Sequence, residues 1–202
     1  MMRLYDFLQS GNGYKVRLLL AQLGIPFERI EVDIRQGESR VASFLAMNRN
    51  GRIPVLELAP GTFLAESNAI LFYLAEGTRW LPAERLERAQ VLQWMFFEQY
   101  SHEPYIAVAR AWLHLFGEME DEKRRQLPQK QKLGYDALDV MESHLGDRAF
   151  FVAARYSIAD IALYAYTHVA DEGGFDLGRF PAVRAWLGRV RAEPGHIPIT
   201  QR

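Results

Sequence analysis

The sequence has no cysteine among its 202 residues. That absence excludes disulfide bonds, thiolate metal sites and a cysteine nucleophile, and it fits a reducing compartment. The five histidines show no spacing typical of metal ligands, so we predict no metal site. No apolar run approaches the ~18 residues that cross a bilayer, and the N-terminus lacks the regions of a signal peptide. We therefore expect a cytoplasmic protein with no membrane partner.

An excess of charge of either sign is also missing. The formal net charge is −1 at pH 7, and the basic residues form only one short run, at residues 123–125. A nucleic-acid partner is therefore not expected, and the chain has neither a phosphate loop nor a dinucleotide fingerprint. Hydrophobic residues make up 49% of the chain, which is enough for a substantial core in one large or two small domains.

The N-terminal part alternates short strands and helices. Residues 3–7 predict a strand, and residues 14–23 predict a helix closed by Gly24. Residues 27–34 alternate apolar and charged side chains, which indicates a half-buried strand, and residues 39–47 carry apolar residues at helical spacing. Because strands joined by a crossover helix lie parallel, this part predicts a βαβ unit followed by a second helix.

The part that follows is organised around a proline. Pro54 lacks the N–H that a β-ladder needs, so it is expected at the first position of a strand, here followed by residues 55–58. Its peptide bond is a candidate for the cis form. After a turn, residues 63–65 return as a second strand, and Ser67 is expected to cap a helix over residues 69–75. This part therefore predicts an antiparallel hairpin and a helix, giving βαβ-α-ββα in all.

These elements also suggest a binding site. A cis bond before Pro54 would turn the backbone groups of Ile53 outward, where they could pair with an extended peptide. The helix N-terminus after Ser67 offers amides and a positive dipole to a carboxylate. Together they describe a site for a small acidic peptide. The alternative is that Pro54 only begins an edge strand and Ser67 only caps a helix.

From residue 84 onward the sequence is helical. A long aromatic-rich helix is expected over residues 84–116, kinked at Pro104, and a second helix over residues 127–145. Ser157 and Asp160 form a variant of the capping box at the start of a further helix. A last helix is predicted over residues 180–192. We therefore divide the chain into an α/β domain, residues 1–77, and an all-helical domain, residues 84–202.

Four stretches in this order resemble the glutathione transferases, and the resemblance covers nearly the whole chain. They are residues 10–16 (SGNGYKV), 48–56 (NRNGRIPVL), 66–70 (ESNAI) and 157–160 (SIAD). The resemblance implies a thioredoxin-like N-terminal domain that binds glutathione, followed by an all-α helical bundle domain. The pattern S/T-x-N-G-x-K is most similar to the bacterial, nu-type branch of the family, although many members carry proline where this chain has Gly11.

Ser10 and Asn12 are the candidate catalytic residues. Both can donate a hydrogen bond to sulfur, and the following helix adds its dipole. The resemblance places such a pair near the glutathione sulfur. The alternative is that Ser10 and Asn12 serve only to form the turn before the helix. Tyr5 is a rival donor because some branches use a tyrosine near the end of the first strand, but here it lies within the strand and is expected as core or pocket wall.

The resemblance also implies how glutathione is held. The backbone of Ile53, before Pro54, would pair with the cysteinyl part; Glu66 would bind the γ-glutamyl ammonium, and Ser67 with its amide the α-carboxylate. Arg52, Lys15 or Arg40 could meet the glycyl carboxylate. We favour Arg52 because it stands beside the proline loop, with surface charge as the alternative reading for all three.

The resemblance implies a second substrate that is a small electrophile, disulfide or peroxide. Its pocket is expected to be lined by Phe7, Leu8, Tyr105, Ile106, Ala109 and Arg110. The family resemblance further implies a homodimer.

Three functions are compatible with these residues. The leading one is a glutathione transferase, whose co-substrate glutathione is ionised for attack on the second substrate. A disulfide reductase or peroxidase of the nu-like type is the first alternative, since that chemistry needs no protein cysteine. A non-catalytic scaffold or ligand-binding member of the same fold is the alternative from another class.

Overall fold

The computed structural model describes residues 1–201 and divides into two compact units. The first is Met1–Gly77 together with the C-terminal tail from Pro194 onward, and the second is Thr78–Glu193. The sequence-based division into residues 1–77 and 84–202 assigns the tail to the helical domain, whereas the structure groups the tail from Pro194 with the first unit. No helix of the described residues has the length and apolar character that a membrane span requires.

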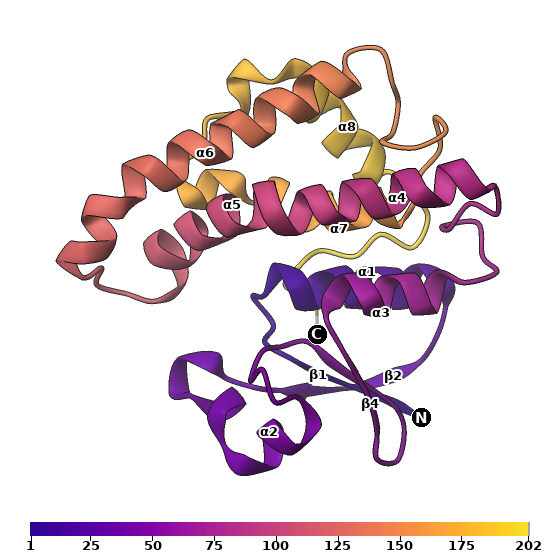
Figure 1. Ribbon diagram of the computed structural model, residues 1–202, viewed down its shortest axis with the longest axis vertical. Coiled ribbons are helices and arrows are strands. Elements are labelled where there is room, and N and C mark those ends of the chain that lie inside the picture. Colours follow the sequence, from indigo (N-terminus) through magenta and orange to yellow (C-terminus); the bar gives the residue numbers. More distant parts are fainter. Residues whose placement is uncertain (202) are drawn as a thin grey trace. The chain divides into compact units, whose positions relative to one another are not determined.

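The first unit is built on a four-stranded mixed sheet. Its strands are β1 (Met2–Asp6), β2 (Phe27–Glu31), β3 (Val55–Ala59) and β4 (Thr62–Ala65), in the order β2-β1-β3-β4. The pair β1–β2 is parallel, while β1–β3 and β3–β4 are antiparallel (Figure 1). The predicted crossover unit and hairpin are both confirmed.

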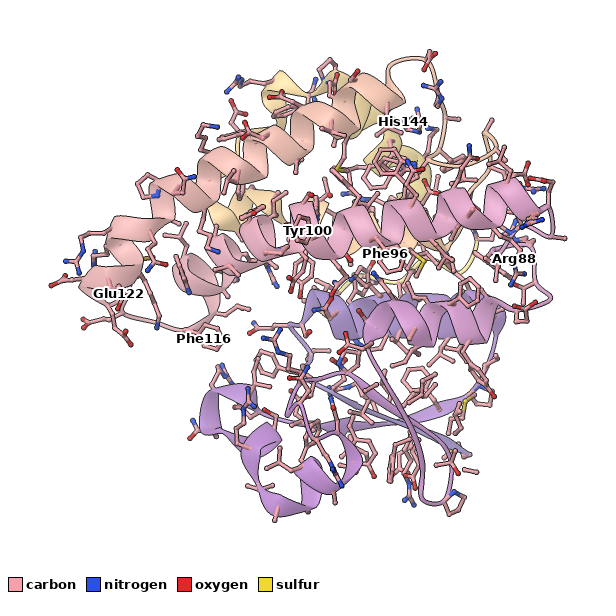
Figure 2. The ribbon with its side chains drawn as sticks, in the orientation of Figure 1. Arg88, Phe96, Tyr100, Phe116, Glu122 and His144 are labelled. Atoms are coloured by element: carbon pink, nitrogen blue, oxygen red, sulfur yellow. The ribbon has the colours of Figure 1, made fainter. Side chains whose placement is uncertain are left out.

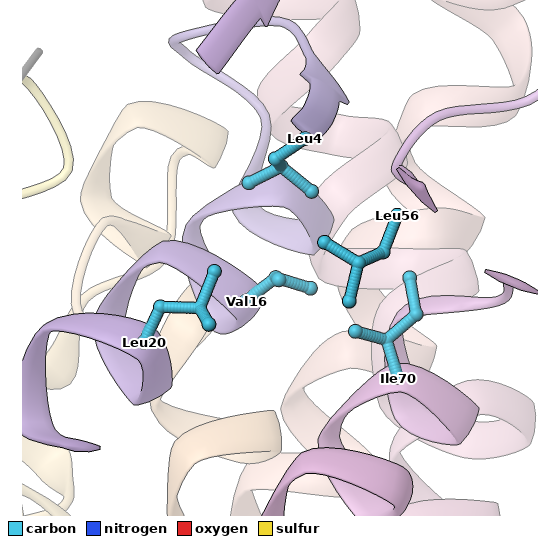
Figure 3. Close-up of a cluster of buried hydrophobic side chains, with 5 residues drawn as sticks. All are labelled: Leu4, Val16, Leu20, Leu56 and Ile70. Carbon is cyan, nitrogen blue, oxygen red and sulfur yellow. The ribbon is translucent and has the colours of Figure 1, made fainter. Parts of the chain in front are cut away.

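Helices α1 (Gly11–Leu23) and α3 (Ser67–Ala75) cover one face of this sheet, and the short helix α2 (Ala42–Met47) lies on the other (Figure 1). Between the sheet and the two helices is a core of fully buried aliphatic side chains (Figure 3): Leu4, Val16, Leu20, Leu56 and Ile70. A second cluster, which includes Phe44 of α2, packs on the opposite face. The result is a thioredoxin-like domain.

The second unit is all helical. Its helices are α4 (Arg85–Phe97), α5 (Glu103–Arg110), α6 (Asp121–Leu145), α7 (Ile158–Thr167) and α8 (Pro181–Arg191). Short helical turns complete the two units: the 3₁₀ turns Ile34–Gln36, Glu38–Arg40, Ala170–Gly173 and Leu177–Arg179, and the π-helical turns Glu98–His102 and Ala111–Leu115. The predicted thioredoxin-like domain followed by a helical domain is therefore confirmed.

Where the sequence predicts one long helix over residues 84–116 with a kink at Pro104, the structure has α4, a π-helical turn and α5 in succession. A π-helical turn, Glu98–His102, ends α4, and Pro104 then stands in the first turn of α5. There its missing N–H removes no helical hydrogen bond. The capping box of α7 is also confirmed, since Ser157 and Asp160 exchange hydrogen bonds with each other's backbone.

Other boundaries differ from the sequence-based predictions. Helix α6 begins at Asp121 rather than at residue 127 and includes Pro128 in its interior. Acidic residues in its first turn complement the helix dipole, which favours the earlier start. Strand β2 ends at Glu31, because Asp33 caps a 3₁₀ turn with its side chain and bends the chain away.

Candidate functional site

The register of the sheet brings three loops of the first unit to one edge. Tyr5, near the end of β1, pairs with Val55 at the start of β3, and Val55 pairs with Ala65 at the end of β4. The loop after β1, the Ile53–Pro54 bond before β3 and the residues that lead into α3 therefore meet at this edge. They carry all seven residues predicted to bind or activate glutathione.

Ser10 is the N-cap of α1. Its backbone is extended, with φ −72° and ψ 124°, and its Oγ accepts a hydrogen bond of 3.2 Å from the amide of Gly13. Helix α1 therefore begins at Gly11, three residues earlier than predicted, because a capping serine allows the glycines to form the first turn. With its oxygen occupied as an acceptor, the hydroxyl keeps its hydrogen for donation to a ligand at the positive end of the helix.

Asn12 connects this cap to the start of α3. The hydroxyl of Ser67 donates to Asn12 Oδ1 over 3.3 Å. Lys15 Nζ donates in turn to Ser67 Oγ at 3.3 Å and to Asn68 Oδ1 at 3.4 Å, and its side chain is fully buried. The N-termini of two helices and one buried cation are thus gathered in one place, which favours an anion. Because Lys15 is enclosed beneath α3, it is a poorer candidate than an exposed arginine for the glycyl carboxylate.

The N-cap of α3 is Glu66, not Ser67 as predicted; Ser67 is the first helical residue. Glu66 has a φ of 68°, which is unusual for a side chain other than glycine, and its carboxylate makes no capping hydrogen bond. Its side chain is exposed. The first-turn amides of α3 are therefore not occupied by a capping side chain, and a strained residue stands beside them, a feature that clusters at functional sites.

The Ile53–Pro54 peptide bond is cis, as the sequence suggested. Pro54 is buried and Ile53 half-buried, and both precede the β3 ladder, which begins at Val55. Arg52 has an exposed side chain, and its carbonyl accepts from Asn48 Nδ2 at 2.8 Å. The guanidinium of Arg40 donates to the carbonyl of Asn50 at 3.0 Å. Arg40 therefore supports the loop, and Arg52 is left to face solvent beside the cis bond.

The hydroxyl of Tyr5, the rival donor, is engaged elsewhere. It donates to Glu57 Oε2 over 3.3 Å on the neighbouring strand. Tyr5 itself lies in the middle of the sheet, paired with Ile30 and Val55. Tyr5 is partly buried, and its role as core or pocket wall stays a prediction.

The residues predicted to line the second-substrate pocket belong to both units. In the first unit, Phe7 and Leu8 border a pocket of about 430 Å³ with Arg35, whose guanidinium lies 4.9 Å from the centroid of the Phe7 ring. In the helical unit, Tyr105 is half-buried, with Lys130 Nζ 5.4 Å from its ring centroid.

The remaining predicted pocket residues lie inside the helical unit. Ile106 and Ala109 are fully buried, and the Arg110 guanidinium is buried against Glu172, with Nε 2.5 Å from Oε2. Of the four pocket residues predicted on α5, Tyr105 is partly accessible to solvent and the other three are buried. The pocket as a whole stays a prediction.

Sequence reasoning missed a buried ion pair beneath the site. Arg17 of α1 donates from Nε to Asp6 Oδ2 over 2.8 Å, and both side chains are excluded from solvent. Burial raises the pKa of the Asp6 carboxyl to about 7, although the Arg17 guanidinium opposes the shift. Burial likewise lowers the pKa of Arg17. Charged residues in short amphipathic elements are normally solvated, so no local pattern marks this pair.

The described residues contain no group of three or more acidic, histidine or cysteine side chains arranged to hold a metal ion.

Comparison with known proteins decides the family. The model of the glutathione S-transferase N-terminal domain matches residues 1–76, and that of the glutathione S-transferase C-terminal domain matches residues 95–194. The chain belongs to the glutathione S-transferase family. The expectation drawn from its four motifs is thereby confirmed at the level of family and fold.

Three relatives show the range of this family. The solved glutathione S-transferase of Pseudomonas fluorescens Pf-5 is 55% identical, with 99% of each chain covered and a TM-score of 0.96. The disulfide-bond oxidoreductase YfcG of Escherichia coli K12 is 31% identical over 93% of this chain and 89% of its own. Another family member from Pseudomonas fluorescens Pf-5, solved with two glutathione bound, is 28% identical, with a TM-score of 0.83, over 96% of this chain and 89% of its own.

Proposed function

We propose that this protein is a glutathione transferase that holds the co-substrate as its thiolate for attack on an electrophilic second substrate. The observation that carries the proposal is the Ser10 cap, which keeps its hydroxyl hydrogen at the positive end of α1. It stands at the sheet edge where the cis bond before Pro54 and the start of α3 also lie. Membership of the glutathione S-transferase family supports the choice of co-substrate.

The energy required of the site is modest. A free thiol has a pKa near 8.5, so lowering it by about two units requires roughly 2.7 kcal/mol in favour of the anion. A hydrogen bond to a charged group contributes about 1.5–3 kcal/mol. Ser10, assisted by the helix dipole and by the Asn12 amide, therefore suffices without a general base or a metal.

The rest of the tripeptide would use the groups already placed at the edge. The Ile53 backbone pairs with the cysteinyl residue, and the exposed Glu66 carboxylate takes the γ-glutamyl ammonium. The α-carboxylate sits at the first turn of α3, on the Ser67 hydroxyl and amide, with the buried Lys15 behind it. Arg52 takes the glycyl carboxylate from solvent. Each contact joins opposite charges or a donor with an acceptor.

Disulfide reduction is the second candidate. It is favoured by the 31% identity to a disulfide-bond oxidoreductase and by a mechanism that needs no protein cysteine. The glutathione thiolate would attack a substrate disulfide, release one thiolate and form a mixed disulfide. A second glutathione thiolate would then release the other half as a thiol and leave oxidised glutathione. The Ser10-Gly11-Asn12-Gly13 stretch, similar to the nu-type branch, fits this chemistry and also a peroxidase.

We also propose that the protein works as a homodimer. Phe96 and Tyr100 lie four residues apart in the helical unit and are labelled in Figure 2. Their exposed fractions are 69% and 83%. Large aromatic side chains so exposed are typical of interfaces. Sedimentation analysis tests this: a Phe96→Glu, Tyr100→Glu variant should sediment as a monomer, and an unchanged mass for that variant would rule out this surface.

Isothermal titration with reduced and oxidised glutathione in parallel tests the function. Saturable binding of the reduced form, followed by product formation with an aryl halide, supports the transferase. Tighter binding of the oxidised form, with turnover of a mixed disulfide instead, supports the reductase. No binding of either form at millimolar concentration contradicts both and favours a non-catalytic scaffold.

Glu66→Gln should weaken binding of the ammonium group, whereas the matched control Glu76→Gln, at the other end of α3, should not.

A further inference from the structure

The buried pair of Asp6 and Arg17 lies directly beneath the loop that presents Ser10. Asp6 is the last residue of β1 and Arg17 lies in the second turn of α1, with exposed fractions of 0% and 1%. Neither residue takes part in the glutathione contacts proposed above. Removing a charge from water is costly unless hydrogen bonds compensate it, so the partners of the buried guanidinium indicate what it does.

The guanidinium of Arg17 joins three parts of the first unit. Besides Asp6, its Nη2 donates to the carbonyl of Leu8 over 2.6 Å. Its Nη1 donates to the carbonyls of Ile199 and Gln201 in the C-terminal tail, over 2.9 and 3.1 Å. A planar fork with five donors can serve the strand, the loop and the tail at once, which a lysine ammonium cannot do with the same geometry.

The tail reaches this position along α1. Its Gly195 lies against Gln22, where an added Cβ would come within 3.1 Å of the Gln22 Cα. Further on, the hydroxyl of Tyr14 donates to the carbonyl of Ile197 over 2.6 Å. The tail is therefore a packed strap, and its last carbonyls complete the coordination of Arg17.

The Ser10 loop depends on these bonds for its shape. Leu8 is held on both sides, since its amide donates to Glu31 Oε1 at 3.2 Å and its carbonyl accepts from Arg17. The loop contains no proline and leads into Gly11 and Gly13, so its covalent structure restricts it little. The two contacts on Leu8, two residues before Ser10, add to the restraint from the Ser10 amide, which donates to the Phe7 carbonyl.

We infer that Arg17 is a positioning residue for Ser10, and that the C-terminal tail at residues 199–201 is part of the same device. The tail and Asp6 fix the guanidinium, the guanidinium fixes the Leu8 carbonyl, and the loop then aims the Ser10 hydroxyl at the glutathione sulfur. This inference rests on the proposed role of Ser10 in holding the thiolate.

Two variants remove hydrogen bonds of the Arg17 guanidinium independently of each other. Arg17→Lys keeps the positive charge beside Asp6 but loses the fork, and deletion of residues 199–202 removes the tail carbonyls while keeping Arg17. The readouts are the apparent pKa of bound glutathione thiol, followed by thiolate absorbance, and hydrogen exchange at the amides of Ser10 and Gly13. These amides are held by the Phe7 carbonyl at 2.8 Å and by the Ser10 hydroxyl at 3.2 Å.

Both variants should lower the ionisation constant of the bound thiol roughly threefold to tenfold, the effect of about one lost hydrogen bond, and so raise its pKa by about 0.5–1 unit. Both should also speed exchange at the two amides, while the dissociation constant of glutathione changes less than the ionisation constant of the thiol. The matched controls are Arg125→Lys and Thr200→Ala, whose side chains are exposed, and both should behave as wild type.

Two results separate the possible failures. A wild-type protein that binds glutathione and forms the thiolate, with variants of unchanged thiol pKa, would overturn the positioning role and leave the proposed function intact. A wild-type protein that forms no thiolate would overturn the proposed function and this inference with it. Unchanged amide exchange in both variants would contradict the inference without reference to glutathione.

Discussion

The substitution Gly13→Ala provides a test, because helix propensity predicts that it raises the free energy of unfolding and tertiary packing predicts that it lowers it. Gly13 lies in the first turn of α1, in helical conformation, directly against the buried carboxylate of Asp6. A methyl group there would lie 1.5 Å from Asp6 Oδ1, 2.1 Å from Cγ and 2.5 Å from Oδ2. These distances are far inside van der Waals contact, and Asp6 cannot retreat without leaving Arg17.

The magnitude follows from two opposing effects. Replacing glycine by alanine within a helix normally stabilises by about 1 kcal/mol. Against this, forcing an extra methyl into a packed site costs about 1–3 kcal/mol, and separating a buried ion pair costs about 3–5 kcal/mol. Gly13→Ala should therefore lower the free energy of unfolding by at least about 3 kcal/mol.

Urea denaturation followed by far-ultraviolet circular dichroism measures this difference, and the chain offers a matched control. Gly188 lies in α8 with an exposed position and nothing within 4 Å of an added Cβ. Gly188→Ala should stabilise by about 0.5–1 kcal/mol, because only the propensity remains. Equal stabilisation by both substitutions would refute the placement of Asp6 against Gly13.

The remaining predictions concern Tyr5, Asp160 and pH. Tyr5→Phe loses its hydrogen bond to Glu57 and should lower stability by about 1 kcal/mol, while the pKa of bound glutathione thiol stays unchanged; a raised thiol pKa would make Tyr5 the donor. Asp160→Ala removes the acceptor of hydrogen bonds from Ser157, Phe151 and Trp186, and should impair folding while leaving glutathione affinity per folded molecule intact; lost affinity in a stably folded variant would make Asp160 a site residue. Burial raises the pKa of Asp160 to about 6 and that of Asp6 to about 7, so the folded state retains protons that the unfolded chain has already lost. The stability from both groups is fully present below about pH 4 and is lost as pH rises through 6 and 7. The urea concentration at the unfolding midpoint should therefore decrease as the pH rises from 5 to 8. Asp160→Asn should make this decrease smaller, and an equal decrease in the variant would contradict the raised pKa of Asp160.

The order of the elements could be predicted because each carries its own local signal. Period-two alternation marks β2, and Ser157 with Asp160 marks the start of α7. The position of the site follows from that order. A parallel crossover and an antiparallel hairpin necessarily bring the end of the first strand, the start of the third and the end of the fourth to one edge.

Helix starts were harder to predict because a cap depends on backbone angles that several residues can adopt. Ser10 caps α1 four residues before Tyr14, where the predicted helix begins, and Glu66 takes the cap position expected for Ser67. Serine is the preferred cap by residue type, so the cap position of Glu66 runs against the sequence preference. The φ of 68° at Glu66 is set by the surrounding structure and has no counterpart in the sequence.

Local sequence patterns could not predict which charged side chains are buried. Lys15 and Arg17 follow the glycines of the first turn and would ordinarily be placed in solvent, yet both are enclosed. Their partners are 11 to 184 residues away in sequence, at Asp6, Ser67 and the tail carbonyl of Gln201. Such pairs become visible only when the fold assembles them, and so does the dependence of the Ser10 loop on the C-terminal tail.

The most direct test of the account is the pKa of glutathione thiol bound to the wild-type protein and to Ser10→Ala. Thiolate absorbance across pH gives both values, and titration calorimetry gives the affinities. The account predicts a wild-type value about two units below the free thiol's 8.5, and a rise of at least about one unit in the variant at nearly unchanged affinity. A wild-type value equal to that of free glutathione, or the same lowered value in both proteins, would contradict it.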